Sequence, residues 1–162
     1  SAASDVYKRQ ALGIINNEVF HGSVNAEHLA VLAMYHDVTE IITGDMPTPV
    51  KYYSKQIRDA YNCVEDDACK ALLEMIPEDI REEYKPFFIK QEADRQLWKF
   101  VKAADKICAY TKCIEESKAG NHDFDKAAKT NLKGLEELDM PEVKCFMEDF
   151  LPSYSLTLDE MN

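Results

Sequence analysis

The sequence has few of the features that mark fibrous, membrane-spanning or disulfide-bonded proteins. Its 162 residues include five glycines and six prolines, too few for a collagen-like chain or a flexible linker. No window approaches about 18 uninterrupted apolar residues, so we expect no transmembrane helix. The five cysteines form no CxxC pair, and the first ten residues lack the apolar core of a signal peptide. We therefore expect reduced thiols and a cytoplasmic protein.

Basic residues are also scarce. The chain has 19 lysines and arginines against 30 aspartates and glutamates, which gives a net charge of −11. A field of this sign repels the nucleic-acid backbone and anionic membranes, so neither is expected as a partner. A small anionic substrate remains compatible with this charge, because a bound metal ion reverses the potential locally.

The patterns that are present are helical. Apolar residues recur at steps of three and four, and no segment shows the period of two that is typical of a strand. Asn25 and Ser54 are predicted N-caps, Gly44 is a predicted helix end, and two prolines predict a loop over residues 44–53. We predict an all-α fold, a compact multi-helix bundle. Its main helices are expected over residues 25–43, 54–76, 93–119, 125–138 and 141–150.

The first ten residues, SAASDVYKRQ, differ from the rest of the chain. They show no helical or strand period that leads into the following sequence, and they resemble a non-native junction found at the ends of translated environmental reads. We predict that residues 1–10 are non-native and that residues 11–162 form a single domain without its N-terminal helix. The alternative is an ordinary disordered N-terminus.

The segment AMYHDVTEIITGD carries the first candidate for chemistry. His36 and Asp37 are adjacent, and Glu40 follows His36 by four residues, which predicts one shared helical face for His36 and Glu40. Three titratable groups on an otherwise apolar helix are costly to desolvate. A metal ion offsets this cost, because imidazole and carboxylate are its natural ligands. The alternative is a surface His-Asp pair with a solvated glutamate.

A second candidate is Asp105, whose neighbours Val101, Ala104 and Cys108 predict a place on the buried stripe of a long helix. A carboxylate there needs a partner, either a bound cation or a lysine or arginine in a salt bridge.

The loop from Gly44 to Pro49 directly follows the His-Asp segment. Its glycine permits a turn back over the helix end, and its prolines stiffen it. Asp45 and Thr48 can hydrogen-bond a ligand hydroxyl. The alternative is an ordinary turn.

These features together resemble the HD-domain metal-dependent phosphohydrolases. The runs HDVTEIITGDMPTPVKYY and VKAADKICAYTKCIEE resemble the 5′-deoxynucleotidases of the YfbR type, and the similarity extends from about Val24 to the C-terminus. The resemblance implies an HD-domain helical fold and one divalent transition metal ion, with cobalt or manganese favoured. It also implies hydrolysis of 2′-deoxynucleoside 5′-monophosphates to a deoxynucleoside and phosphate.

Carried over position by position, the resemblance implies metal ligation by His36, Asp37 and Asp105. It makes Glu40 the catalytic acid or the carboxylate that orients water. The implied substrate-binding residues are Asp37, Asp45, Met46, Pro47, Thr48 and Asp105.

One expected ligand is missing from this pattern. The family's earlier histidine, about 35 residues before His36, would fall near Ser1 in the anomalous segment. His28 is about 12 Å from His36 along a helix, so the two cannot bind one ion directly. His21 matches no ligand of the family. We expect these two histidines and His122 to be ordinary surface residues.

Two alternatives to the deoxynucleotidase remain open at this point. One is an HD phosphohydrolase that acts on another nucleotide, although the TGDMPTP loop argues against the signalling-nucleotide branches. The other is a non-catalytic helical module, which the missing histidine favours. The base preference, the physiological metal and the formation of a homodimer are also open.

Overall fold

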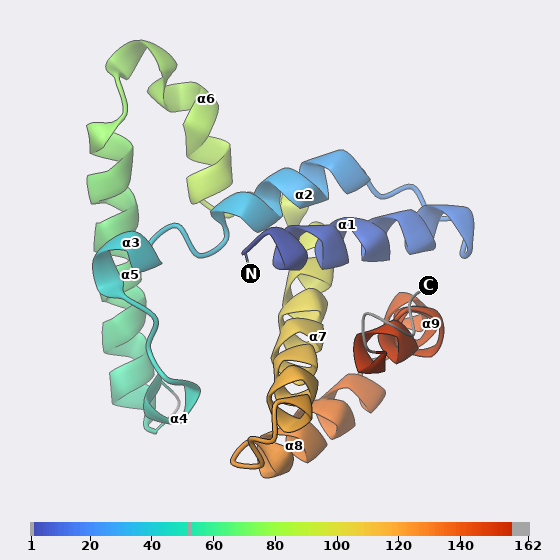
Figure 1. Cartoon of the computed structure of the whole chain (residues 1–162). Coiled ribbons are helices and arrows are strands. Elements are labelled where there is room, and N and C mark those ends of the chain that lie inside the picture. Colours follow the sequence, from blue (N-terminus) through green and yellow to red (C-terminus); the bar gives the residue numbers. More distant parts are fainter. Residues whose placement is uncertain (1, 52, 157–162) are drawn as a thin grey trace. The chain divides into compact units, whose positions relative to one another are not determined.

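The computed structural model describes residues 2–51 and 53–156, and every regular element in these ranges is helical. The prediction of an all-α fold is therefore confirmed. Nine α-helices are present in the described ranges: α1 (Ala2–Glu18), α2 (Ala26–Tyr35), α3 (Glu40–Thr43), α4 (Thr48–Lys51), α5 (Lys55–Met75), α6 (Glu78–Phe88), α7 (Leu97–Lys118), α8 (Asp125–Glu136) and α9 (Pro141–Asp149) (Figure 1). Short 3₁₀ turns occupy Glu92–Asp94 (η1) and Leu151–Ser155 (η2). No helix of these ranges has the length and apolar character needed to cross a bilayer.

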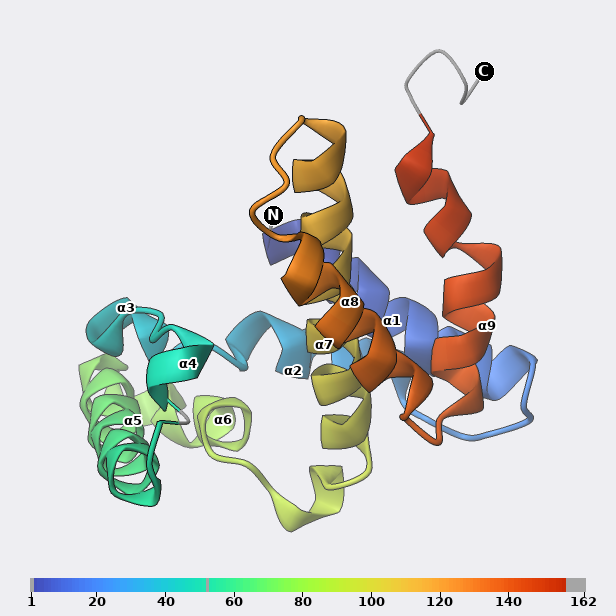
Figure 2. The same cartoon turned by 90° about the horizontal axis from the view of Figure 1, so that it is seen from below.

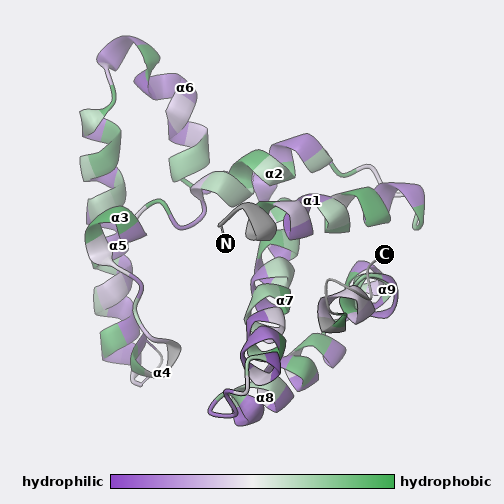
Figure 3. Ribbon diagram, viewed as in Figure 1, coloured by the Kyte–Doolittle hydropathy of each residue, from purple (hydrophilic) through white to green (hydrophobic). Residues whose placement is uncertain are grey.

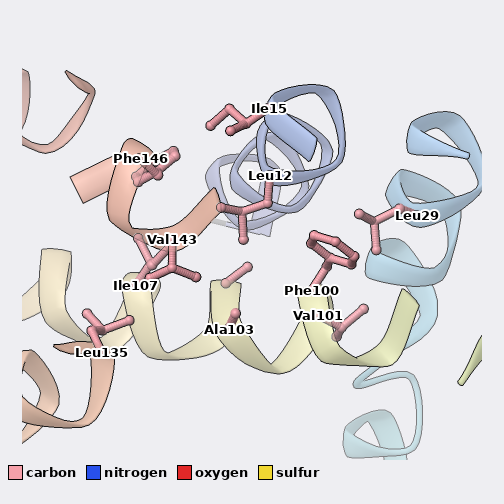
Figure 4. Packing of buried hydrophobic residues seen from close by; sticks show 11 residues of the cluster. Leu12, Ile15, Leu29, Phe100, Val101, Ala103, Ile107, Leu135, Val143 and Phe146 are labelled. Carbon is pink, nitrogen blue, oxygen red and sulfur yellow. The ribbon is translucent and has the colours of Figure 1, made fainter. Parts of the chain in front are cut away.

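The chain divides into two compact units, Ser1–Ala33 with Gln96–Asn162, and Met34–Arg95. In the first unit, α1 and α8 both pack against the long helix α7, and α9 packs against α1 (Figures 1 and 2). Side chains from these helices and from the start of α2 meet in one core (Figure 4). Leu12, Leu29 and Ile107 are fully buried there. Burial of such side chains supplies most of the stabilisation of a helical bundle.

The second unit is built on α5. Helix α6 returns alongside it, and the short helices α3 and α4 both contact α5. Both apolar and polar residues lie along α5, as the hydropathy colours of Figure 3 show. Tyr35 packs against the rings of Tyr84, Phe87 and Phe88, with centroids 5.5 to 6.3 Å apart. This aromatic cluster joins the end of α2 to α6.

Local signals for helix ends are confirmed at three positions. The Oδ1 atom of Asn25 accepts a hydrogen bond from the amide of His28 at 2.9 Å. The hydroxyl of Ser54 accepts one from the amide of Ile57 at 3.2 Å. Gly44 ends α3 with a φ of 68°, a left-handed conformation that glycine adopts without steric cost.

The predicted single helix over residues 25–43 is wrong. Helix α2 ends at Tyr35, and residues 36–39 form a turn before α3 begins. Backbone bonds across the break run to the third preceding residue, as from the amide of Val38 to the carbonyl of Tyr35 at 3.0 Å. Val38 and Thr39 are β-branched, which weakens helix at this point, while Tyr35 is held in the aromatic cluster.

Two further expectations of local structure are wrong. The predicted loop over residues 44–53 contains the one-turn helix α4, which includes Pro49. Proline is tolerated in a first turn because its missing N–H has no partner there. Residues 2–10 are helical and continue into α1, although no helical period was recognised in them. That residues 1–10 are non-native, and that residues 11–162 form a single domain, stay predictions.

Candidate functional site

His36 and Asp37 lie in the turn between α2 and α3. The Nε2 atom of His36 is 2.6 Å from the Oδ2 atom of Asp37, and the two side chains are 14% and 54% exposed. The predicted helical face shared by His36 and Glu40 does not form, because His36 precedes the helix that Glu40 begins. The turn instead brings the imidazole and the carboxylate of the His-Asp pair into direct contact.

Glu40 is the half-buried first residue of α3. Burial raises the pKa of its carboxyl group, and the negative charges of Asp37 and Asp45 raise it further. Interactions with His36 and Lys51 lower the pKa of Glu40 and so act in the opposite direction. Three carboxylates and an imidazole are therefore electrostatically coupled within the second unit, an arrangement that a bound cation would stabilise.

The loop after α3 carries the remaining predicted substrate residues of this unit. Asp45 and Pro47 are exposed and Met46 is half-buried. The side chain of Thr48 lies outside the part of the chain that the structure describes, and its backbone begins α4. The loop thus holds Asp45 close enough to Glu40 for its charge to raise the pKa of the Glu40 carboxyl group.

Asp105 lies on α7 in the first unit. Its neighbours Val101, Ala104 and Cys108 are buried, but its own side chain is 46% exposed, so the prediction of a buried carboxylate is wrong. The residue sits at the edge of the apolar stripe. The predicted alternative, an ion pair with a basic residue, is present: the guanidinium of Arg9 on α1 donates a hydrogen bond to Oδ1 of Asp105.

A complete metal-binding cluster is not formed within either unit by the described residues, since no three histidine, cysteine or acidic side chains converge there. His36 and Asp37 belong to the second unit and Asp105 to the first. Ligation of one ion by all three residues therefore stays a prediction.

The other histidines follow the expectation in part. His21 and His122 are exposed, and Nδ1 of His122 is 3.3 Å from Oδ2 of Asp125. His28 is half-buried on α2.

Two residues beside the loop were not predicted. The hydroxyl of Tyr61 on α5 is 3.2 Å from the carbonyl oxygen of Gly44. The Nζ atom of Lys51 is 2.9 Å from Oε1 of Glu65 and 4.6 Å from the centre of the Tyr61 ring. In the sequence, Tyr61 has the spacing of an apolar core position on α5, and this spacing carries no signal for the bond that its hydroxyl makes.

Comparison with known proteins gives the same family as the motifs. Residues 7–154 match the family described as 5′-deoxynucleotidase YfbR-like. The 5′-deoxynucleotidase of Vibrio vulnificus is 48% identical over 152 residues, which cover 94% of this chain and 78% of that protein. The 5′-deoxynucleotidase of Shewanella oneidensis is 45% identical over the same shares of both chains.

The fold has a solved counterpart. A crystal structure of an HD-domain phosphohydrolase from Listeria innocua matches with a TM-score of 0.76 and 23% identity, covering 94% of this chain and 74% of that one. At this identity the likeness supports the helical HD-domain fold. The match over residues 7–154 and the 48% identity to the Vibrio vulnificus protein show that the chain belongs to the YfbR-like 5′-deoxynucleotidase family.

Proposed function

We propose that this protein removes the 5′-phosphate from 2′-deoxynucleoside 5′-monophosphates, giving a deoxynucleoside and inorganic phosphate. The observation that carries this proposal is the 43 to 48% identity, over 94% of the chain, to proteins named 5′-deoxynucleotidase. The coupled imidazole and carboxylates of the second unit are chemically suited to this reaction.

The donor set fits a divalent transition metal. His36 offers a nitrogen and Asp37 an oxygen within 2.6 Å of each other, and the acidic neighbours of Glu40 favour a cation. We propose His36, Asp37 and Asp105 as the ligands, and cobalt or manganese as the metal. When bound, such an ion supplies Lewis acidity toward the phosphate and toward water.

Glu40 has the properties of a proton-transfer group. Its raised pKa keeps the carboxyl group closer to the range in which it both accepts and donates a proton. We assign to it one of two roles: it orients the attacking water, or it protonates the departing 5′-oxygen as the phosphorus–oxygen bond breaks.

The loop residues are assigned to the nucleoside. Asp45 to Thr48 are proposed to contact the sugar and base. Asp37 and Asp105 are also proposed as substrate-binding residues. Asp45 is exposed, and an ionised aspartate only accepts hydrogen bonds, so it suits a sugar hydroxyl as partner.

The proposal includes a cytoplasmic location. Its support is that all five cysteines are free thiols, as is usual in a reducing compartment.

A substrate panel tests the proposed function. Phosphate release is measured with each 2′-deoxynucleoside 5′-monophosphate, the matching ribonucleotide and the matching 3′-monophosphate, in the presence of Co²⁺ or Mn²⁺. The deoxynucleoside 5′-monophosphates are expected to give the highest kcat/KM. Equal or faster release from ribonucleotides would instead support the alternative nucleotide phosphohydrolase.

A glutamate variant tests the role of Glu40 in the same assay. Glu40→Gln is expected to lower kcat by about 10² to 10⁴ while it leaves metal binding in place. The matched control is Glu83→Gln, which changes an exposed glutamate of α6 in the same unit. Full activity of Glu40→Gln would refute the assignment.

A further inference from the structure

The segment between α3 and the end of α4 is attached to one face of α5 at both of its ends. At the first end, the hydroxyl of Tyr61 is 3.2 Å from the carbonyl oxygen of Gly44 and 3.4 Å from Oγ1 of Thr43. The Gly44 carbonyl belongs to the peptide bond that leads into Asp45. A hydrogen bond to this oxygen therefore fixes the plane of that peptide bond.

The far end of the segment is held by Lys51, the last residue of α4. Its Nζ atom is 2.9 Å from Oε1 of Glu65 and lies over the ring of Tyr61, 4.6 Å from its centre. Tyr61 and Glu65 are four residues apart on α5 and so share one face of that helix. Tyr61 is the residue that touches both ends.

The contacts among Tyr61, Lys51 and Glu65 are partly shielded from solvent, which strengthens them. Tyr61 is 7% exposed, and the side chains of Lys51 and Glu65 are 28% and 30% exposed. Partly desolvated charge pairs and cation–π contacts are stronger than those at an open surface. Gly44 has a φ of 68° and no side chain to pack. Its carbonyl oxygen also accepts a hydrogen bond from Oγ1 of Thr43 at 3.0 Å, and its amide donates to the carbonyl of Glu40 at 2.9 Å. Both of those bonds stay within residues 40–44, so the bond from the Tyr61 hydroxyl is the one that links Gly44 to α5.

We propose that Tyr61 is a positioning residue for substrate: together with Lys51 and Glu65 it clamps the loop of Asp45, Met46 and Pro47 in the conformation that receives the nucleoside. The inference rests on the proposed function, because it takes this loop to be the part that contacts the sugar and base. Tyr61 acts through the backbone of Gly44 and touches no substrate.

Tyr61→Phe tests this role, because it removes only the hydroxyl and keeps the ring under Lys51. Losing one hydrogen bond of ordinary strength is expected to raise KM for a deoxynucleoside 5′-monophosphate about 3- to 10-fold. The kcat is expected to change by less than about twofold. Tyr84→Phe is the matched control, since it removes a hydroxyl from the aromatic cluster of the same unit.

Amide hydrogen exchange gives a second readout that does not need activity. Gly44 donates to the carbonyl of Glu40 at 2.9 Å, and Val50 donates to the carbonyl of Pro47 at 2.8 Å. Exchange over residues 44–51 is expected to be at least about threefold faster in Tyr61→Phe and unchanged in Tyr84→Phe.

The two readouts separate the failures. Exchange and KM equal to those of the wild type would overturn the inference, and so would faster exchange with an unchanged KM. If the wild-type chain releases no phosphate from any deoxynucleoside 5′-monophosphate, the proposed function fails. In that case amide exchange alone tests whether Tyr61 holds the loop. Unchanged exchange rates over residues 44–51 in Tyr61→Phe would show that it does not.

Discussion

The Nε2 atom of His36 lies 2.6 Å from the Oδ2 atom of Asp37, in the turn that joins α2 to α3. Adjacent residues seldom direct their side chains to one place within a helix, because successive positions differ by about 100° around the axis. The break after Tyr35 removes this restriction. The break therefore allows a nitrogen ligand and an oxygen ligand for a metal ion to lie side by side, and borderline divalent metals prefer this mixture of ligand atoms.

Removing the imidazole is predicted to weaken metal binding. We expect His36→Ala to lower the affinity for Co²⁺ at least about tenfold, measured by equilibrium dialysis. His122→Ala is the control, because His122 also lies beside an aspartate, with its Nδ1 3.3 Å from Oδ2 of Asp125, but outside the candidate site. An equal affinity in both variants would contradict the assignment of His36.

Asp105 is predicted to be a ligand as well as the partner of Arg9. We expect Asp105→Asn to lose bound metal and metal-dependent phosphate release. Arg9→Met is the informative comparison, because it abolishes the ion pair but keeps the Asp105 carboxylate. Retention of metal in Arg9→Met and its loss in Asp105→Asn would separate the two roles. Metal content unchanged in Asp105→Asn, by elemental analysis, would refute the ligand role.

Glu40 is predicted to make stability depend on pH. Its folded pKa is raised above the ordinary value of 4.5, so the folded state binds more protons than the unfolded state between these two values. Stability is therefore lost as pH rises through this window. In the metal-free protein, Glu40→Gln is expected to be more stable than the wild type at neutral pH.

The stability difference between Glu40→Gln and the wild type is expected to depend on pH. Below the ordinary pKa of 4.5 the wild-type carboxyl group is neutral in both the folded and the unfolded state, so the two proteins should have the same free energy of unfolding. Urea denaturation at several pH values measures this free energy, with Glu83→Gln as the control. A variant less stable than the wild type at neutral pH would contradict the direction.

The core of the first unit gives a prediction of stability. Ile107 is fully buried on α7, so Ile107→Ala is expected to cost about 2 to 5 kcal/mol of unfolding free energy. Ile14→Ala makes the same deletion at a side chain of α1 that is 47% exposed. Chemical denaturation should show a much smaller loss there. Similar losses in the two variants would mean that the core is not as described.

Local chemistry explains which parts of the fold were predictable. Asn25, Ser54 and Gly44 act through hydrogen bonds or backbone angles within a few residues, and each was recognised from its neighbours. The end of α2 at Tyr35 was missed, because the aromatic cluster that holds it comes from α6, about fifty positions later in the chain. A one-dimensional apolar pattern has no access to such a partner.

The candidate site likewise has features that the local sequence predicts and features that depend on distant residues. His36, Asp37, Glu40 and Asp45 were found as a dense group of titratable residues, and the electrostatic coupling of Glu40 to the other three agrees with that grouping. The partial exposure of Asp105 was missed, since it depends on a position at the edge of the stripe and on an arginine 96 residues away.

The most direct test of the account is phosphate release from a 2′-deoxynucleoside 5′-monophosphate by the chain before chelation, after chelation, and after Co²⁺ or Mn²⁺ is restored. The account predicts release by the metal-loaded protein, its loss after chelation, and its recovery with either ion. Undiminished release by the chelated protein, or no release with any divalent metal, would contradict it.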